Sequence, residues 1–487
     1  MMRRCLVALA ALNFAVPALA ATPGVDAPPL PQPPRAVVMP PLHEHTLPNG
    51  LTLVVAPRST APVVTLGVLV RAGPELDPPG RAGTAAMTAG LLSKGAKRGG
   101  RAVSATELAR QAEALGTSLD AGSGWRSSTV AMTVTTPKLD AAAALLADVV
   151  RQPTLAAAEL ERARAQSLDG LRVTLGDPAQ VSVLVARRQY WGDTAYGRLV
   201  APATLKRLTR SDIAAFHAAW YRPERTVLVL AGDIDLARGR ALAERLFGNW
   251  RVAGQVPVVP AAAKPEPLPE ALLLIDMPGS GQSGVMVTAP FVETRSSERR
   301  IGQVASTVLG GGYSARLNQE VRIKRGLSYG AFSEVEVHPQ AGMLHASTQT
   351  NHPTAVQVLD LLRGEIRRLA DAPPPADELA ARQATLVGSF ARRLETTGGL
   401  ASLVVAQLVA ARPLDELART VDEVMAVTPE QVQSFAKTHW KPDALRGVIA
   451  GDLKAAGDTL VPLNGSARRI TIDALDLEQP TLAKPAK

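Results

Sequence analysis

The sequence is poor in cysteine, in aromatic residues and in long apolar runs. Its one cysteine, Cys5, lies in an N-terminal stretch that we expect to be removed. The remaining chain then has no thiol for a disulfide, a cysteine zinc site or a cysteine nucleophile. Aromatic residues make up 3% of the chain and the basic residues form no block, which argues against nucleic-acid binding. Beyond the N-terminal stretch no apolar run reaches about 18 residues, so we predict no membrane span.

The N-terminus has the pattern of a secretory signal. Arg3 and Arg4 precede an apolar stretch over residues 6–16, and residues 18–20 form a small-x-small cleavage site. We therefore predict a signal peptide over residues 1–20 and a periplasmic or secreted product, with a buried N-terminal helix as the alternative. The formal charge is +9, or +7 once both arginines are removed, and its thin spread indicates a solvated basic surface.

The two halves of the chain resemble each other. "TRSDIAAFHAAWYRPERTVLVLAGD" (209–233) aligns without gaps with "TPEQVQSFAKTHWKPDALRGVIAGD" (428–452), at an offset of 219 residues. Each copy has a threonine N-cap, a helix with an apolar stripe, a proline stop and a β-rich run. We infer two homologous domains of the α+β class.

Within each half, strands are grouped and helices occur in blocks. Runs such as "LTLVVA" and "STVAMTVTT" alternate as strands do, whereas "LDAAAALLADVV" has a helical period. This grouping favours two α/β sandwich domains, each a largely antiparallel sheet packed with helices, over a doubly wound fold. The predicted boundaries are a proline-rich leader (21–41), an N-terminal domain (42–252), a linker (253–271), a C-terminal domain (272–465) and a tail (466–487).

Two short motifs carry little weight. "GSGQSG" (279–284) fits G-x-G-x-x-G, but strand-like runs flank it, so a turn between strands is favoured over a dinucleotide site. His43 and His45 share one strand face, although no third metal ligand is evident, and edge-strand polarity is the favoured interpretation.

Residues 45–98, "HTLPNGLTLVVA…GTAAMTAGLLSKGAKR", resemble the N-terminal signature of the pitrilysin/insulinase-type metallopeptidases, the inverzincins. In that family a helix between similar glycines carries H-x-x-E-H, and a downstream glutamate completes the zinc site. The resemblance places Ala86 and Gly90 at the histidine positions, Ala89 at the catalytic glutamate and Leu168 at the third ligand, while a nearby family glutamate is kept as Glu161. It therefore implies that this chain holds no zinc and no other cofactor. No H-x-x-E-H or H-E-x-x-H occurs elsewhere in the chain.

"VLGGGYSARLNQEVRIKRGLSYGAF" (308–332) resembles the C-terminal signature of the same family, a glycine-rich turn, a helix and R-x6-Y. The resemblance implies that Arg322 and Tyr329 bind the substrate carbonyl or oxyanion, with Gly326 ending the helix and a strand over "GLSYGAF". Arginine and tyrosine suit this task because both donate hydrogen bonds to developing negative charge. The alternative is that Arg322 only pairs with a helix C-terminus and Tyr329 is a core residue.

The resemblance implies a chain that is inactive alone. The first hypothesis is a subunit of a two-subunit metalloendopeptidase that supplies Arg322 and Tyr329 to a zinc-bearing homologous partner for peptide hydrolysis. The second is a peptide-binding or chaperone-like scaffold of the same fold. The sequence leaves open the substrate, the partner and whether the dimer is homo- or heteromeric.

Overall fold

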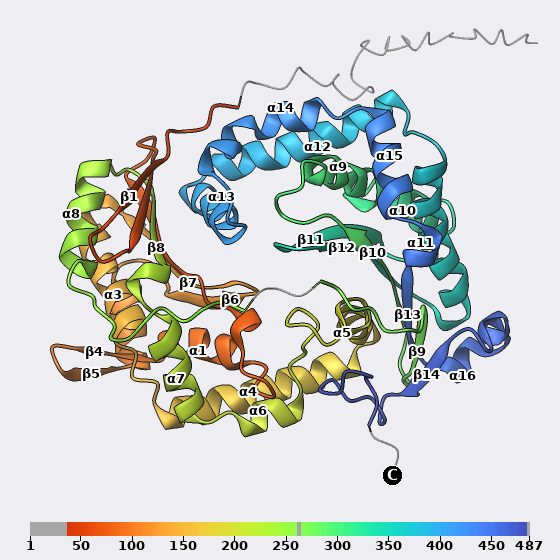
Figure 1. Cartoon of the computed structure of the whole chain (residues 1–487), viewed down its shortest axis with the longest axis horizontal. Coiled ribbons are helices and arrows are strands. Elements are labelled where there is room, and N and C mark those ends of the chain that lie inside the picture. The colour runs from red at the N-terminus through yellow and green to blue at the C-terminus, as the bar shows by residue number, and fades with distance from the viewer. Residues whose placement is uncertain (1–36, 261–263, 485–487) are drawn as a thin grey trace, which may run out of the picture. The chain divides into compact units, whose positions relative to one another are not determined.

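The computed structural model describes residues 37–260 and 264–484. The predicted signal peptide, its cleavage site and most of the leader lie outside the described residues. Two six-stranded sheets organise the chain (Figure 1). The first runs, in spatial order, β1 (His43–Thr46), β2 (Thr52–Pro57), β8 (Thr226–Gly232), β3 (Val63–Val70), β7 (Ser127–Thr135) and β6 (Asp120–Gly124).

The second sheet repeats this plan. Its order is β11 (Ala331–Val337), β12 (Gly342–Thr350), β10 (Ser283–Phe291), β13 (Arg446–Gly451), β9 (Leu272–Asp276) and β14 (Arg468–Thr471). Antiparallel pairs predominate in both sheets, with parallel pairing of β2 with β8 and of β9 with β13 and β14. A small ribbon of β4 (Gly95–Arg98) and β5 (Arg101–Ser104) lies apart. The predicted α+β class with largely antiparallel sheets is confirmed.

Helices form around each sheet in matching order. Those of the first half are α1 (Thr84–Leu92), α2 (Ala105–Ala114), α3 (Leu139–Arg151), α4 (Ala157–Gly176), α5 (Pro178–Trp191), α6 (Pro202–Arg207), α7 (Arg210–Trp220) and α8 (Leu236–Phe247). Those of the second half are α9 (Arg299–Gly310), α10 (Arg316–Asn318), α11 (Ala355–Asp371), α12 (Ala376–Leu394), α13 (Thr397–Val409), α14 (Thr420–Met425), α15 (Pro429–His439) and α16 (Leu453–Ala456). The helices α7 and α15 both begin with a threonine capping box, as the aligned repeat predicts.

One face of each sheet is covered by helices of its own half. Buried side chains of β2, β3 and β7 pack with α3 and α8, and those of β10 and β12 pack with α9, α11 and α15. Alternate residues of each strand point to this face, so the other face of each sheet still needs a cover.

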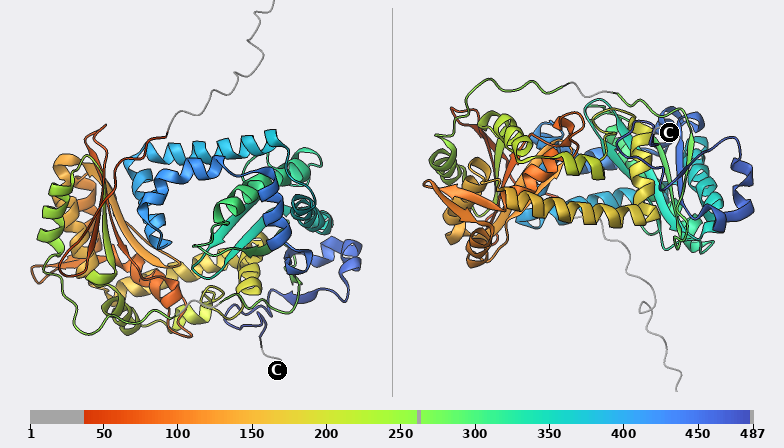
Figure 2. Two further views of the ribbon diagram at one scale, coloured as in Figure 1. Left: turned by 45° about the horizontal axis from the view of Figure 1, so that its top comes forward. Right: turned by 90° about the horizontal axis from the view of Figure 1, so that it is seen from below.

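The other face is covered by a helix of the opposite half. From the first half, α5 contributes Val181 and Val185 to a core with Ile275 and Val448 of the second sheet. From the second half, α13 contributes Leu400 and Val404, among others, to a core on β2, β3 and β8. Figure 1 shows α4 and α5 leading toward the second sheet and α12 and α13 leading back toward the first, and Figure 2 shows the same exchange from two further directions. The two halves therefore share their cores.

Two segments with irregular sequence patterns have definite contacts. The linker between α8 and β9 is tied to the first half, since Arg222 donates to the Gly254 carbonyl at 2.9 Å and the Leu268 amide donates to the Gln189 carbonyl at 2.8 Å. The chain after residue 465, predicted to be a tail, contains β14, an edge strand of the second sheet. Its run Arg468–Thr471 is too short for periodicity to reveal, but Ile470 is buried in the core under α5.

The "GSGQSG" segment joins β9 to β10, as expected for a connection between strands, although β13 separates these two strands in the sheet. Among the described residues, no single helix is both long and apolar enough to cross a membrane. The pair Thr397–Val409 and Leu414–Met425 satisfies that length and composition only when joined across a 120° bend.

Candidate functional site

The helix α1 is held at its N-terminus by a buried carboxylate. Gly83 has a φ of 101°, and the backbone amides of Gly83 and Ala85 each donate to Asp77 at 2.7 Å. Burial raises the pKa of the Asp77 carboxyl to about 7, against the opposing effect of these backbone hydrogen bonds. The helix therefore keeps a defined start although its exposed face carries no chemical group.

The positions that resemble a zinc motif fall along α1 with unequal exposure. Ala86 is exposed, Gly90 is half-buried and Ala89 is fully buried. The space at Gly90 is open, because no atom lies within 4 Å of where a Cβ would stand. None of these residues has a side-chain donor atom for a metal or a group that transfers a proton.

On α4 the family's third ligand position is an apolar contact. Leu168 packs against a cluster that includes Met87, Leu91 and Leu160, so α4 is joined to α1 by hydrophobic contact. The retained Glu161 is exposed and forms an ion pair with Arg164, at 3.0 Å. That hydrogen bond with Arg164 holds the pKa of the Glu161 carboxyl below its usual value. Leu168 thus supplies packing, and Glu161 belongs to a surface ion pair.

A cavity of about 400 Å³ lies beside Ala86, and most of its lining is apolar. It is lined by Pro74, Asp77, Ala82, Gly83, Ala86, Trp125, Leu171, Thr174, Leu184, Arg187, Arg198, Leu199 and Val200. Within this lining, Arg187 lies over an aromatic ring, with its Cζ 4.1 Å from the centroid of the Trp125 ring. This space suits an apolar side chain better than an ion.

The residues present do not fit a zinc ion. Throughout residues 37–260 and 264–484, no group of three or more His, Cys, Asp or Glu side chains is arranged to hold a metal. His43 and His45 lie on β1, which is an edge strand of the first sheet, as predicted. Two imidazoles without a third ligand do not make a zinc site.

Arg322 and Tyr329 lie together in the second half. Arg322 is in a π-helical turn over Gln319–Ile323, whose C-cap is Lys324. Gly326 follows with a φ of 62°, and its amide donates to the Arg322 carbonyl at 2.9 Å. Nη1 of Arg322 donates to the Tyr329 carbonyl oxygen at 2.6 Å. The predicted C-cap, Gly326, thus lies two residues beyond the observed one, although Gly326 does take the left-handed conformation that glycine readily adopts and so closes the turn.

The surroundings of Tyr329 differ from the sequence-based prediction in one respect. The strand expected over "GLSYGAF" begins only at Ala331, so Tyr329 lies in the turn before β11. Its side chain is 93% exposed, which excludes the alternative that it is a core residue. The turn replaces the strand because Gly326 and Gly330 interrupt the alternation that pairing requires.

Tyr313 is a third member of this group that the sequence motif does not identify. The Arg322 Cζ lies 4.2 Å from the centroid of the Tyr313 ring and 5.9 Å from that of Tyr329. Both contacts hold the guanidinium by cation–π attraction. The sequence signal for this contact was the position of Tyr313 directly after three glycines. A glycine-rich turn can place such a ring over the helix that follows. The exposed face of this group offers hydrogen-bond donors to a carbonyl or anionic oxygen.

Comparisons with known proteins agree with this geometry. Residues 53–179 match the model for insulinase, peptidase family M16, and residues 207–386 match the model for the M16 inactive domain. Together the two models span more than half of the chain. An uncharacterised zinc protease of Streptomyces coelicolor is 26% identical over 403 residues, covering 80% of this chain and 86% of the relative. The non-peptidase homolog YmxG of Helicobacter pylori is 22% identical over 400 residues, covering 81% and 90%.

Solved structures share the fold. The crystal structure of an M16 inactive domain from Pseudomonas fluorescens matches with a TM-score of 0.76 and 23% identity, over 84% of this chain and 98% of that one. A protease from Helicobacter pylori matches with a TM-score of 0.78 and 18% identity, over 84% and 99%. The resemblance inferred from the two sequence signatures is confirmed. The chain belongs to the insulinase, or M16, family of peptidases.

Proposed function

We propose that this chain is the non-zinc subunit of a two-subunit metallopeptidase and supplies Arg322 and Tyr329 to the active site of a zinc-bearing homologous partner. The observation that carries the proposal is a contrast between the halves. The first half keeps the helix α1 but offers only Ala86, Ala89 and Gly90 on it, whereas the second half keeps an exposed tyrosine beside an arginine. Such a chain has oxyanion donors but no means of activating water by itself.

The exposure of Tyr329 supports a role in contact with another molecule. A tyrosine ring that is 93% exposed contributes little to the stability of its own chain. Arg322 donates a hydrogen bond to the Tyr329 carbonyl and so constrains the backbone that carries the tyrosine hydroxyl. A constrained donor is what stabilisation of a developing oxyanion requires.

The remaining parts of the proposal concern location and substrate. The secretory pattern of residues 1–20 favours the periplasm or the exterior. Peptides are the proposed substrate class because the donors suit a scissile carbonyl oxygen. The name of the relative from Helicobacter pylori, a non-peptidase homolog, is consistent with a chain that does not cleave peptides by itself.

The test is reconstitution of this chain with a zinc-bearing homologue that co-purifies from the native host. Tyr329→Phe keeps the exposed ring and removes the hydroxyl. We expect turnover of a peptide by the pair to fall about 100- to 1000-fold, with a smaller change in KM, because the donor acts mainly in the transition state. Arg322→Lys keeps the charge but loses the planar fork, so this variant should also be impaired.

The matched control is Tyr221→Phe, which removes a hydroxyl from a fully buried tyrosine of the first half and should leave turnover unchanged. If both site variants assemble with the partner and cleave at the unmutated rate, the composite site is refuted. A pair that binds peptides but hydrolyses none would instead support the scaffold function.

A further inference from the structure

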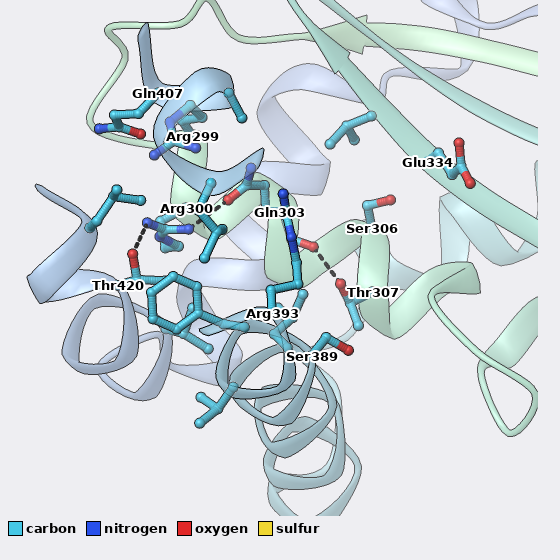
Figure 3. A pocket seen from close by; sticks show the side chains of 18 of the residues that line it. Arg299, Arg300, Gln303, Ser306, Thr307, Glu334, Ser389, Arg393, Gln407 and Thr420 are labelled. Atoms are coloured by element: carbon cyan, nitrogen blue, oxygen red, sulfur yellow. Dashed lines mark hydrogen bonds between the residues drawn. The ribbon is translucent and has the colours of Figure 1, made fainter. Parts of the chain in front are cut away.

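A second cavity, of about 490 Å³, lies in the C-terminal half between α9, β11, α12 and α13. Figure 3 shows Arg299, Arg300 and Gln303 of α9 and Arg393 of α12 extending into the space that they line. Neither Arg322 nor Tyr329 lines it. The cavity is therefore separate from the proposed oxyanion group.

One of its arginines is already neutralised. Nη2 of Arg300 lies 3.0 Å from a carboxylate oxygen of Glu423, and Nη1 donates to the side-chain oxygen of Gln303 at 3.0 Å. These contacts hold Arg300 in place, which makes it a fixed part of the wall.

The other two arginines have no such partners. Among the described residues, the side chains of Arg299 and Arg393 form no hydrogen bond and no ion pair, and Nε of Arg299 is buried without an acceptor. Arg299 as a whole is half-buried, and its enclosed Nε has no acceptor, which is costly for a donor of a charged group. An anionic ligand in the cavity would supply the hydrogen-bond acceptor that Arg299 lacks. Arg393 is exposed at the rim, where it adds positive charge without a comparable cost.

Apolar and neutral polar side chains form most of the remaining lining, the polar ones being Ser306, Thr307, Ser333, Ser389, Gln407 and Thr420. Leu386, Val387 and Phe390 come from α12, and Leu403 comes from α13. Glu334 on β11 is the one acidic residue of the lining, and its side chain is 79% exposed. The cavity therefore has a surplus of positive charge beside apolar side chains. The carboxylate of Glu334 disfavours ligands of high negative charge.

We propose that this cavity binds one carboxylate carried by an apolar peptide segment, with Arg299 as the principal hydrogen-bond donor to that carboxylate. Arginine pairs with carboxylates through two parallel hydrogen bonds, which adds geometric selectivity to charge. A cavity of this size holds a carboxylate together with a neighbouring apolar side chain. The carboxylate is either an acidic side chain or a free C-terminus, because both present the same group. Binding here requires neither zinc nor a partner subunit.

The test measures direct binding to the purified full-length chain by fluorescence anisotropy. Three fluorescein-labelled octapeptides serve as probes: a Leu-Glu-Leu core with an amidated C-terminus, a Leu-Gln-Leu core with an amidated C-terminus, and Leu-Gln-Leu at a free C-terminus. Tight binding of the first alone identifies an acidic side chain as the source, and binding of the third alone identifies the C-terminal carboxylate. Equal affinity for all three peptides overturns the proposal, as does no binding of any of them.

Variants connect the binding to this cavity. Arg299→Gln should weaken binding of the preferred peptide about tenfold or more, since a hydrogen bond to a charged group is lost, and Arg393→Gln should weaken it less. Arg367→Gln is the matched control, because Arg367 is exposed on α11 and does not line the cavity. If Arg299→Gln remains folded by circular dichroism and binds as tightly as Arg367→Gln, the site is refuted. Because no hydrolysis is measured, this result is independent of the composite active site.

Discussion

The helices α5 and α13 occupy equivalent places in the two halves, yet they are secured by different chemistry. Each crosses to the opposite sheet, and their residues correspond at the same offset of 219 found in the aligned repeat. Both begin at a side-chain N-cap, Asp177 in α5 and Thr396 in α13. Val185 corresponds to Val404, and both are fully buried against the sheet. The shared apolar stripe accounts for the exchange itself.

The last turns of the two helices differ. In α5, Gln189 is fully buried and donates to the carbonyls of Glu270 and Gly447 at 3.0 and 3.3 Å. The equivalent residue in α13 is Leu408, which is buried among apolar side chains. One helix end is therefore fixed by directional hydrogen bonds and the other by non-directional packing.

Aromatic residues, scarce elsewhere, reinforce the end of α5. Trp191 is fully buried. The centroid of its ring lies 5.1 Å from that of Tyr190 and 5.2 Å from those of Tyr196 and His338. The equivalent residue after α13 is the half-buried Ala410. An apolar stripe is thus enough to bring a helix onto the opposite sheet, whereas the polar and aromatic end of α5 makes one of the two crossings specific in register.

The largest effect is expected from removing the aromatic anchor of α5. Trp191→Ala leaves a cavity at the contact between the halves and should lower the free energy of unfolding by about 3–5 kcal/mol. Urea unfolding followed by circular dichroism measures the loss. The control is Trp220→Ala, a half-buried tryptophan of the first half, which should cost clearly less. Equal losses from the two variants would contradict a special role for the end of α5.

The ion pair of α5 provides a dependence on pH. Arg187 pairs with Glu336 of β11, whereas α13 has Ala406 at the equivalent position. Burial raises the pKa of Glu336, but the hydrogen bond with His338 and the charge of Arg187 outweigh it and hold the pKa at about 2. Because the pKa of Glu336 is lower in the folded chain, its carboxylate stabilises the fold at any pH above the ordinary carboxyl pKa. We expect up to about 3 kcal/mol of this stabilisation to be lost as the pH falls from about 4.5 toward about 2.

Unfolding by urea at several values from about pH 7 to about pH 3 tests this prediction. Glu336→Gln should be less stable than the wild type at neutral pH, and the difference should narrow as the pH falls. Glu334→Gln changes an exposed neighbour on the same strand and should leave the dependence intact. A constant difference between wild type and Glu336→Gln at every pH would show that the carboxylate charge is not what stabilises this crossing.

Exchanging the equivalent residues sharpens the comparison of the two helix ends. Gln189→Leu leaves the Glu270 and Gly447 carbonyls without their donor, and Leu408→Gln buries an amide in an apolar core. Each change should lower the free energy of unfolding by about 2 kcal/mol. The control is Gln433→Leu, because this residue also donates to backbone carbonyls but is only half-buried. If Gln189→Leu is as mild as this control, hydrogen bonding does not secure α5.

The smallest effect is expected at the start of α13. The hydroxyls of Thr397 and Thr65 lie 2.8 Å apart, which joins α13 to β3. Thr397→Val keeps the side-chain shape and removes this bond, so the cost should be about 1 kcal/mol. Urea unfolding again measures the change, with Thr385→Val, an exposed threonine of α12, as the comparison. A loss as large as that of Trp191→Ala would mean that the α13 crossing is also secured by polar contacts.

Local patterns predicted much of the secondary structure. The strand β7 and the helix α3 lie within one residue of the runs that indicated them, because alternation and helical period are local properties. The short strand β14 was missed, since four residues carry too little pattern. The motif placed Arg322 and Tyr329 together, but Tyr313 joins them only through the fold of the glycine-rich turn.

The sequence by itself determined the repeat, the fold class, the family resemblance and the absence of metal ligands at Ala86, Gly90 and Leu168, because each depends on residue type and spacing along the chain. The exchange of α5 and α13 between the halves was decided only by the tertiary structure. Both helices bury apolar side chains against the sheet that they cover, and hydrophobic burial is non-directional, so patterning alone does not choose which sheet that is. The choice depends on contacts far apart in sequence, such as Gln189 with Gly447, and on the burial that makes those hydrogen bonds costly to lose.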